Sequence, residues 1–169
     1  VALDMDGTTL NSKSEISEET IKVLKECVDK GVKVVLASGR EFLSLEKYVN
    51  IIGTKDYQIT LNGAVIYDPH NKKRIMESIM NIEHYKEMLD KITKKGNAHL
   101  VYDAEKYYCD KRIKNTLISK KLSDIMGVKV NKVDNYLDSK DPTKIMIIEL
   151  IESRLTSVQD FLKNDELKI

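Results

Sequence analysis

The chain has 169 residues, of which 41% are hydrophobic, so it is long enough to bury a core as one large domain or two small ones. Its 28 Lys and Arg residues nearly balance its 27 Asp and Glu residues, which argues against the basic surface typical of a nucleic-acid-binding protein. No apolar run approaches the ~20 residues of a membrane span and no signal peptide is recognisable, so we expect a cytoplasmic protein without a membrane partner.

The first third of the chain alternates between short apolar runs and amphipathic segments. The apolar runs at 1–3, 32–37 and 57–61 are predicted to be strands, and the β-branched second run is typical of a strand buried on both faces. Helices are expected between them, over 17–31 with Ser17 as the N-cap, and over 41–49. This β-α-β-α-β order predicts a parallel, right-handed, Rossmann-like sheet.

The pattern changes after residue 62. Segments 64–67 and 74–78 flank the turn sequence Asp68-Pro69-His70-Asn71, which predicts a hairpin. Further strands are predicted at 100–102, 107–109, 128–133 and 144–150, and further helices at 82–95, 112–126 and 152–163.

This later order is α+β, unlike the alternation that precedes it. We therefore expect a domain boundary near 78–82. The sequence predicts an α/β core domain over 1–80 and an inserted α+β cap domain over 81–169.

Both ends of the chain have the pattern of an interrupted sequence. Only three residues precede Asp4, whereas a typical strand has about 5–6 residues. The apolar pattern at 167–169 resembles a strand that is just beginning. We expect a chain that is truncated in the C-terminal part of its core.

Polar side chains follow each of the three predicted parallel strands. Asp4 and Asp6 follow the first strand, Ser38 follows the second and Asn62 follows the third. The carboxyl ends of parallel strands meet at one edge of the sheet, where open α/β sheets bind their ligands. We therefore predict one site at this edge, assembled from residues that are far apart in the sequence.

The two carboxylates suit chemistry on a phosphate ester. A carboxylate shielded by a divalent cation can attack phosphorus, and a second carboxylate can protonate the leaving oxygen and then accept a proton from water. Asp4, which is nearest the strand, suits the first role, and Asp6, in the loop, suits the second. Backbone amides near Gly7 and the hydroxyl of Ser38 could donate to phosphate oxygens, and Mg²⁺ fits hard oxygen ligands.

The same aspartates also permit a different interpretation, the calcium-binding loop of an EF-hand. Residues of suitable type stand at several of its ligand positions, but Thr9 stands where that loop needs glycine. Moreover, the apolar run before Asp4 is not the helix that enters an EF-hand. A plain surface turn is a further alternative for the pair.

The other candidates have simpler interpretations too. Ser38 could only cap the following helix, and Arg40 could be a surface residue of its first turn. The pair Asn62-Gly63 is also a good hairpin turn. Thr8 and Thr9 could only satisfy loop backbone groups.

Three segments together resemble the haloacid dehalogenase superfamily, and within it the Cof-type phosphatase branch with an α/β cap: Asp4-Met5-Asp6-Gly7-Thr8, Ala37-Ser38-Gly39-Arg40 and Asn62-Gly63-Ala64. The resemblance covers residues 1–80 by motif and the cap by layout. It implies that Asp4 is the nucleophile and a Mg²⁺ ligand, and that Asp6 is the general acid/base and binds the metal through its backbone carbonyl.

The resemblance also implies which residues bind the substrate. Ser38 would be a phosphate ligand, and the other residues near the phosphate or the substrate would be Gly7, Thr8, Gly39, Arg40 and Asn62. The implied activity is Mg²⁺-dependent hydrolysis of a small phosphorylated metabolite through an aspartyl-phosphate on Asp4.

The chain departs from the family in one respect. The superfamily's later motifs, a lysine and an acidic G-D-x-x-N-D cluster, are absent, and Lys144, at the start of an apolar strand, is not taken as that lysine. Two alternatives therefore stay open: phosphomutase-like phosphoryl transfer, and a non-catalytic fragment or binding module. The sequence specifies neither the substrate nor the oligomeric state.

Overall fold

The computed structural model describes residues 1–103, 106–110, 112, 116–126, 131–132, 139–149 and 160. The chain divides into two compact units, the first of residues 1–80 with 115–130 and the second of 81–114 with 131–169. Apart from residue 160, the predicted helix over 152–163 lies outside the described residues, as does the segment 167–169. The assignment of 81–169 as a cap stays a prediction.

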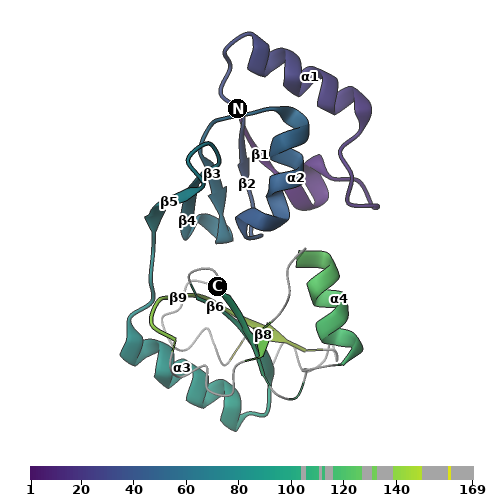
Figure 1. Ribbon diagram of the computed structural model, residues 1–169. Coiled ribbons are helices and arrows are strands. Elements are labelled where there is room, and N and C mark those ends of the chain that lie inside the picture. The colour runs from purple at the N-terminus through teal and green to yellow at the C-terminus, as the bar shows by residue number, and fades with distance from the viewer. Residues whose placement is uncertain are drawn as a thin grey trace. The chain divides into compact units, whose positions relative to one another are not determined.

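The first unit is built on a five-stranded mixed sheet whose strand order follows the sequence (Figure 1). The first three strands run parallel, as predicted, and the last two form the predicted hairpin and are added antiparallel. The strands are β1 (Ala2–Asp4), β2 (Val35–Ala37), β3 (Gln58–Thr60), β4 (Val65–Asp68) and β5 (Lys73–Glu77).

Strands β2 and β3 are shorter than their apolar runs, and side chains accept from backbone N–H groups in and just before β2. The Val34 N–H donates to the Asp56 carboxylate at 2.9 Å, and the Leu36 N–H donates to Gln58 Oε1 at 2.7 Å. Gln58 is fully buried, so this bond satisfies polar groups inside the sheet.

The first two helices of the first unit begin at side-chain caps. Helix α1 (Glu18–Asp29) begins after Ser17, whose hydroxyl accepts from Thr20 N, as the sequence predicts. Helix α2 (Phe42–Ile52) begins after Glu41, whose carboxylate accepts from Leu43 N at 2.8 Å. Ser38 therefore does not cap this helix, and the simpler interpretation of that residue is wrong.

Helices α1 and α2 pack against each other and enclose the core of the unit. Each helix contributes the residues of its apolar face to this core, and the strands and loops contribute the remaining buried residues. The buried cluster is Met5, Leu10, Ile16, Leu24, Val34, Leu36, Phe42, Leu45, Tyr48, Val49 and Ile52.

The second unit contains a four-stranded sheet in the order β8-β7-β6-β9. The central β6 pairs antiparallel with β7 and β9, and the predicted pairing of 100–102 with 107–109 is confirmed. Helix α3 (Ile82–Lys94) contacts β6 and β9. The strands are β6 (Ala98–Asp103), β7 (Lys106–Cys109), β8 (Asn131–Lys132) and β9 (Pro142–Ile148).

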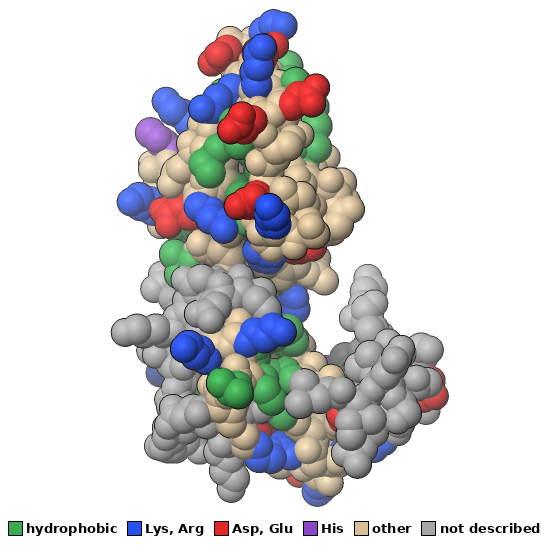
Figure 2. All heavy atoms as spheres, turned by 90° about the vertical axis from the view of Figure 1, so that its right-hand side faces the viewer, with side chains coloured by type: hydrophobic (Ala, Val, Ile, Leu, Met, Phe, Trp, Pro, Cys, Tyr) green, Lys and Arg blue, Asp and Glu red, His purple; other side chains and the backbone are tan. Residues whose placement is uncertain are grey.

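Helix α4 (Leu117–Met126) starts five residues after the predicted start at 112. It is grouped with the first unit in the division of the chain. Within the described residues, no helix combines the length and apolar character needed to cross a membrane. Basic and acidic side chains are interspersed on the face drawn in Figure 2, in keeping with the balanced charge of the sequence.

Candidate active site

The strand register brings the predicted site residues to one edge of the first sheet. Asp4 pairs with Ala37, and Ala37 pairs with Ile59, so the residues that follow these strands leave the sheet side by side (Figure 1). Ser38 directly follows β2, and its N–H donates to Ile59 O at 3.0 Å. The convergence that the alternation of elements predicted is therefore present.

The loop after β1 fixes Asp4 through two threonines. Residues Met5–Thr9 make one wide turn, closed by Leu10 N donating to Met5 O at 2.9 Å, and Met5 is buried. The Thr8 hydroxyl donates to the Asp4 carboxylate at 3.2 Å, and the Thr9 hydroxyl donates to the Asp4 carbonyl at 2.5 Å. The Asp4 side chain is thus oriented while it stays exposed to a ligand.

Gly7 has φ +77°, which its neighbours in the loop could adopt only with strain. This conformation turns the chain between Asp6 and Thr8. The Thr9 hydroxyl bonds a backbone carbonyl, which agrees with the interpretation that Thr9 satisfies a loop backbone group, and that carbonyl belongs to Asp4.

Asp6 and Arg40 form an ion pair that the sequence did not indicate. Arg40 Nε donates to one carboxylate oxygen at 2.8 Å and Nη2 donates to the other at 2.6 Å. This bidentate hydrogen bonding lowers the pKa of Asp6 and raises the pKa of Arg40, against a smaller opposing effect of burial on each. Asp6 is therefore held as a carboxylate in this arrangement.

The turns after β2 and β3 are joined by backbone hydrogen bonds. Asn62 N donates to Ser38 O at 3.1 Å, and Leu61 N donates to Arg40 O at 3.0 Å. The Arg40 N–H donates to Ser38 Oγ at 3.1 Å, which leaves the hydroxyl proton of Ser38 available to a bound oxygen. The turn after β2, with Ser38 and Arg40, and the turn after β3, with Asn62, are thus held together by hydrogen bonds.

Asn62 has φ +59° and Gly63 has φ +91°, the left-handed pair favoured in a tight hairpin turn. This turn connects β3 to β4, which pair antiparallel. Asn62-Gly63 is therefore both a hairpin turn and part of the candidate site, so its two interpretations are compatible.

Gly39 and Asn62 fit against each other. A β-carbon added at Gly39 would overlap Asn62 Oδ1. We expect Gly39→Ala to lower the free energy of unfolding by about 1–3 kcal/mol, because the Asn62 carboxamide must move or the turn must shift.

A double-mutant cycle measured by urea denaturation tests this prediction. Asn62→Gly removes the carboxamide and suits the left-handed φ, so Gly39→Ala should cost much less in that background. Strictly additive effects of the two substitutions would contradict the proposed overlap.

The geometry decides against an EF-hand, because strand β1 stands where an entering helix would be needed. Across the part of the chain that the structure describes, no three His, Cys, Asp or Glu side chains are grouped to hold a metal. The exposed Asp4 carboxylate and the Asp6 backbone carbonyl are hard oxygen donors, a partial set that fits Mg²⁺, which keeps several water ligands.

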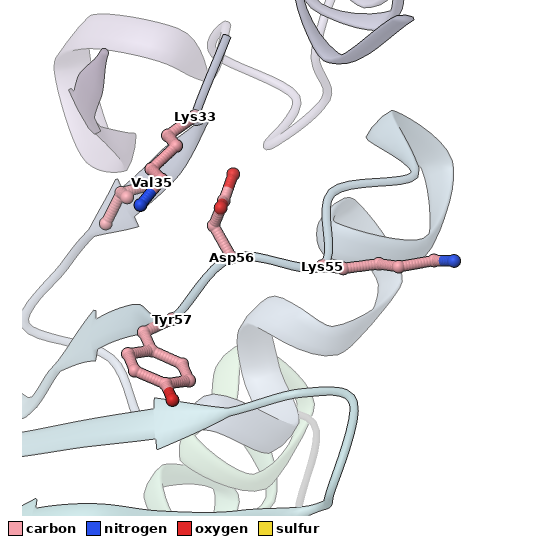
Figure 3. Close-up of a pocket in the computed structure, with 5 residues that line it drawn as sticks. All are labelled: Lys33, Val35, Lys55, Asp56 and Tyr57. Carbon is pink, nitrogen blue, oxygen red and sulfur yellow. The ribbon is translucent and has the colours of Figure 1, made fainter. Parts of the chain in front are cut away.

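A pocket of about 380 Å³ lies at the opposite end of the strands and is separate from this site. It is lined by residues at the amino ends of β2 and β3, among them Lys33, Lys55 and Asp56. Figure 3 shows Lys55 directed away from the pocket. The Asp56 carboxylate accepts from Val34 N and from the Thr54 hydroxyl, which gives it a structural role.

Taken together, the three parallel strands and the carboxylates and hydroxyl at their carboxyl ends define a Rossmann-like α/β protein with a polar site at its strand ends. The family model of haloacid dehalogenase-like hydrolases matches residues 1–169. The chain belongs to this family, and the resemblance inferred from its motifs is confirmed.

Two curated relatives are phosphatases. The chain is 34% identical over 90 residues to the 5-amino-6-(5-phospho-D-ribitylamino)uracil phosphatase of Bacillus subtilis. This match covers 53% of this chain and 36% of that protein. It is 36% identical over 72 residues to the HMP-PP phosphatase of Serratia proteamaculans, and this match covers 43% of this chain and 26% of that protein. The matched segments thus span about a third of these relatives or less.

Solved structures of other proteins share the fold. A haloacid dehalogenase-like hydrolase from Bacteroides thetaiotaomicron superimposes with a TM-score of 0.80 at 22% identity, over 95% of this chain and 61% of that one. A Thermotoga maritima protein gives a TM-score of 0.76 at 24% identity, over 97% of this chain and 61% of that one. The chain therefore spans about 61% of the length of these structures.

Proposed function

We propose that the whole protein is a Mg²⁺-dependent phosphatase that hydrolyses a small phosphorylated metabolite of the cytoplasm through an aspartyl-phosphate on Asp4. The observation that carries the proposal is the placement of Asp4, exposed at the end of β1, oriented by Thr8 and beside the turn that holds Ser38. Membership of the hydrolase family and the phosphatase names of the relatives support it.

In the first step a carboxylate oxygen of Asp4 attacks phosphorus, and the bond from phosphorus to the leaving oxygen breaks. Because its pair with Arg40 keeps Asp6 ionised in the free protein, Asp6 first takes up a proton from solvent and then donates it to that oxygen, so the leaving group departs as an alcohol. In the second step Asp6 accepts a proton from water as the water oxygen attacks phosphorus, and inorganic phosphate leaves Asp4.

The neighbouring groups hold the transferred phosphoryl group. The Ser38 hydroxyl and the amides near Gly7 would donate to its oxygens, and Thr8 keeps the Asp4 carboxylate aimed at it. Mg²⁺ bound by the Asp4 carboxylate and the Asp6 carbonyl would supply positive charge that offsets the repulsion between carboxylate and phosphate. Residues 81–169, as the cap, would select the leaving group.

Phosphate release from a panel of phosphorylated metabolites by the full-length protein tests the proposal. We expect hydrolysis of at least one compound with Mg²⁺ and its loss with EDTA, with activity restored by excess Mg²⁺. No release from any compound would contradict a phosphatase. Phosphoryl transfer that depends on an added acceptor, with little free phosphate, would instead support a phosphomutase.

A further inference from the structure

We propose that Arg40 is a positioning residue, which acts by holding the Asp6 carboxylate in place rather than by binding the phosphate or the substrate. The proposal rests on the proposed function, because it assigns to Asp6 the proton transfers described above. It differs from what the motif resemblance implies, which is that Arg40 lies against the phosphate or the substrate.

The loop after β1 does not itself orient Asp6. The Asp6 side chain is 58% exposed and is flanked by Gly7, and within the described residues its carboxylate accepts only from Arg40. Asp4, by contrast, is held by Thr8 within the same loop. Without Arg40, an exposed aspartate beside glycine would populate several rotamers.

Arg40 is well placed to orient Asp6, because most of its side chain is buried and its backbone is hydrogen-bonded on both sides. Its side chain is only 17% exposed. Its backbone N–H donates to Ser38 Oγ, and its backbone carbonyl accepts from Leu61 N. Tyr48 on α2 is also within electrostatic reach of the guanidinium, and the Tyr48 hydroxyl donates to Ser14 O at 2.8 Å. The Arg40 backbone is thus anchored at the sheet edge, and its mostly buried side chain lies near Tyr48 of α2.

The ion pair joins both carboxylate oxygens of Asp6 to two N–H groups of the planar Arg40 guanidinium. Such a bidentate pair fixes the plane of the carboxylate as well as its distance, which a single ammonium cannot do. Proton transfer depends on this kind of placement, since a misplacement of about 1 Å can cost about 100-fold in rate. Removing Arg40 should therefore affect turnover more than substrate binding.

The first experiment measures kcat and KM of the full-length protein as Arg40→Met and Arg40→Lys. We expect kcat to fall by about 10- to 100-fold in Arg40→Met with KM changed by less than about threefold, and an intermediate kcat in Arg40→Lys. Arg74→Met is the matched control, because Arg74 is also 17% exposed and pairs with Glu77 outside the site. It should leave both constants unchanged.

Affinity for inorganic phosphate, measured by calorimetry, separates positioning from binding. We expect Arg40→Met to retain it within about threefold and Ser38→Ala to weaken it more. A rise in KM and a loss of phosphate affinity in Arg40→Met, with kcat unchanged, would overturn the proposal, because that is the behaviour of a direct ligand.

A nuclear magnetic resonance measurement is independent of turnover. The Arg40 Nε–H should give a protected cross-peak in the wild-type full-length protein at neutral pH and lose it in Asp6→Asn, since Asp6 accepts from Nε. A cross-peak that is equally protected in both proteins would overturn the pairing. If the wild type released no phosphate but showed this loss, the proposed activity would fail while the positioning of Asp6 would stand.

Discussion

Asp4→Asn in the full-length protein is expected to lower kcat by at least about 10³-fold, because the amide has no anionic oxygen to attack phosphorus. The substitution keeps the shape of the side chain, and its amide oxygen can still accept from the Thr8 hydroxyl that orients Asp4. The loop should therefore stay folded, and the effect should fall on chemistry rather than on binding.

Steady-state phosphate release and calorimetric binding of inorganic phosphate, measured on the same preparations, check this prediction. We expect phosphate affinity to be retained while turnover is lost. Asp29→Asn, at the exposed end of α1, is the matched control and should leave both unchanged. Near-normal turnover of Asp4→Asn would rule out an aspartyl-phosphate on Asp4.

Leu36→Ala should have the largest effect on stability. Leu36 is fully buried on β2, which lies between β1 and β3. Truncating a buried leucine loses transfer free energy and leaves a cavity, so we expect the free energy of unfolding to fall by about 2–5 kcal/mol. That is a large part of the about 5–15 kcal/mol that keeps a typical domain folded.

Urea denaturation of the two proteins measures this loss, and Leu43→Ala provides the control. Leu43 is 53% exposed on α2, so the same substitution there should change the free energy of unfolding by less than about 0.5 kcal/mol. Equal effects at the two positions would mean that β2 is not at the centre of the packed core.

Much of the first unit could be predicted from local patterns. The β-α-β-α-β alternation implied parallel strands because a crossover helix returns the chain in the same direction. The parallel order then placed Asp4 and Ser38 at one edge, as the register confirms. Ser17 could be predicted as a helix cap because its hydroxyl accepts from the N–H of Thr20, only three residues along the chain.

Other features depended on partners that local patterns do not contain. Strand β2 begins at Val35 rather than at residue 32, and the Val34 N–H before it donates to the Asp56 carboxylate, 22 residues away. Ser38 had the residue type of a helix cap, but Glu41 occupies that role. Such outcomes are set by distances in the folded chain, which residue type alone does not give.

The sequence by itself determined the family, the element order of the first unit and the two aspartates at the end of β1, because these follow from short motifs and from the periodicity of apolar residues. Only the tertiary structure decided that Arg40 pairs with Asp6, 34 residues away, and that Asn62 packs against Gly39. The physical reason is range: backbone preferences act over a few residues, whereas an ion pair between two turns requires the strand register that brings those turns together.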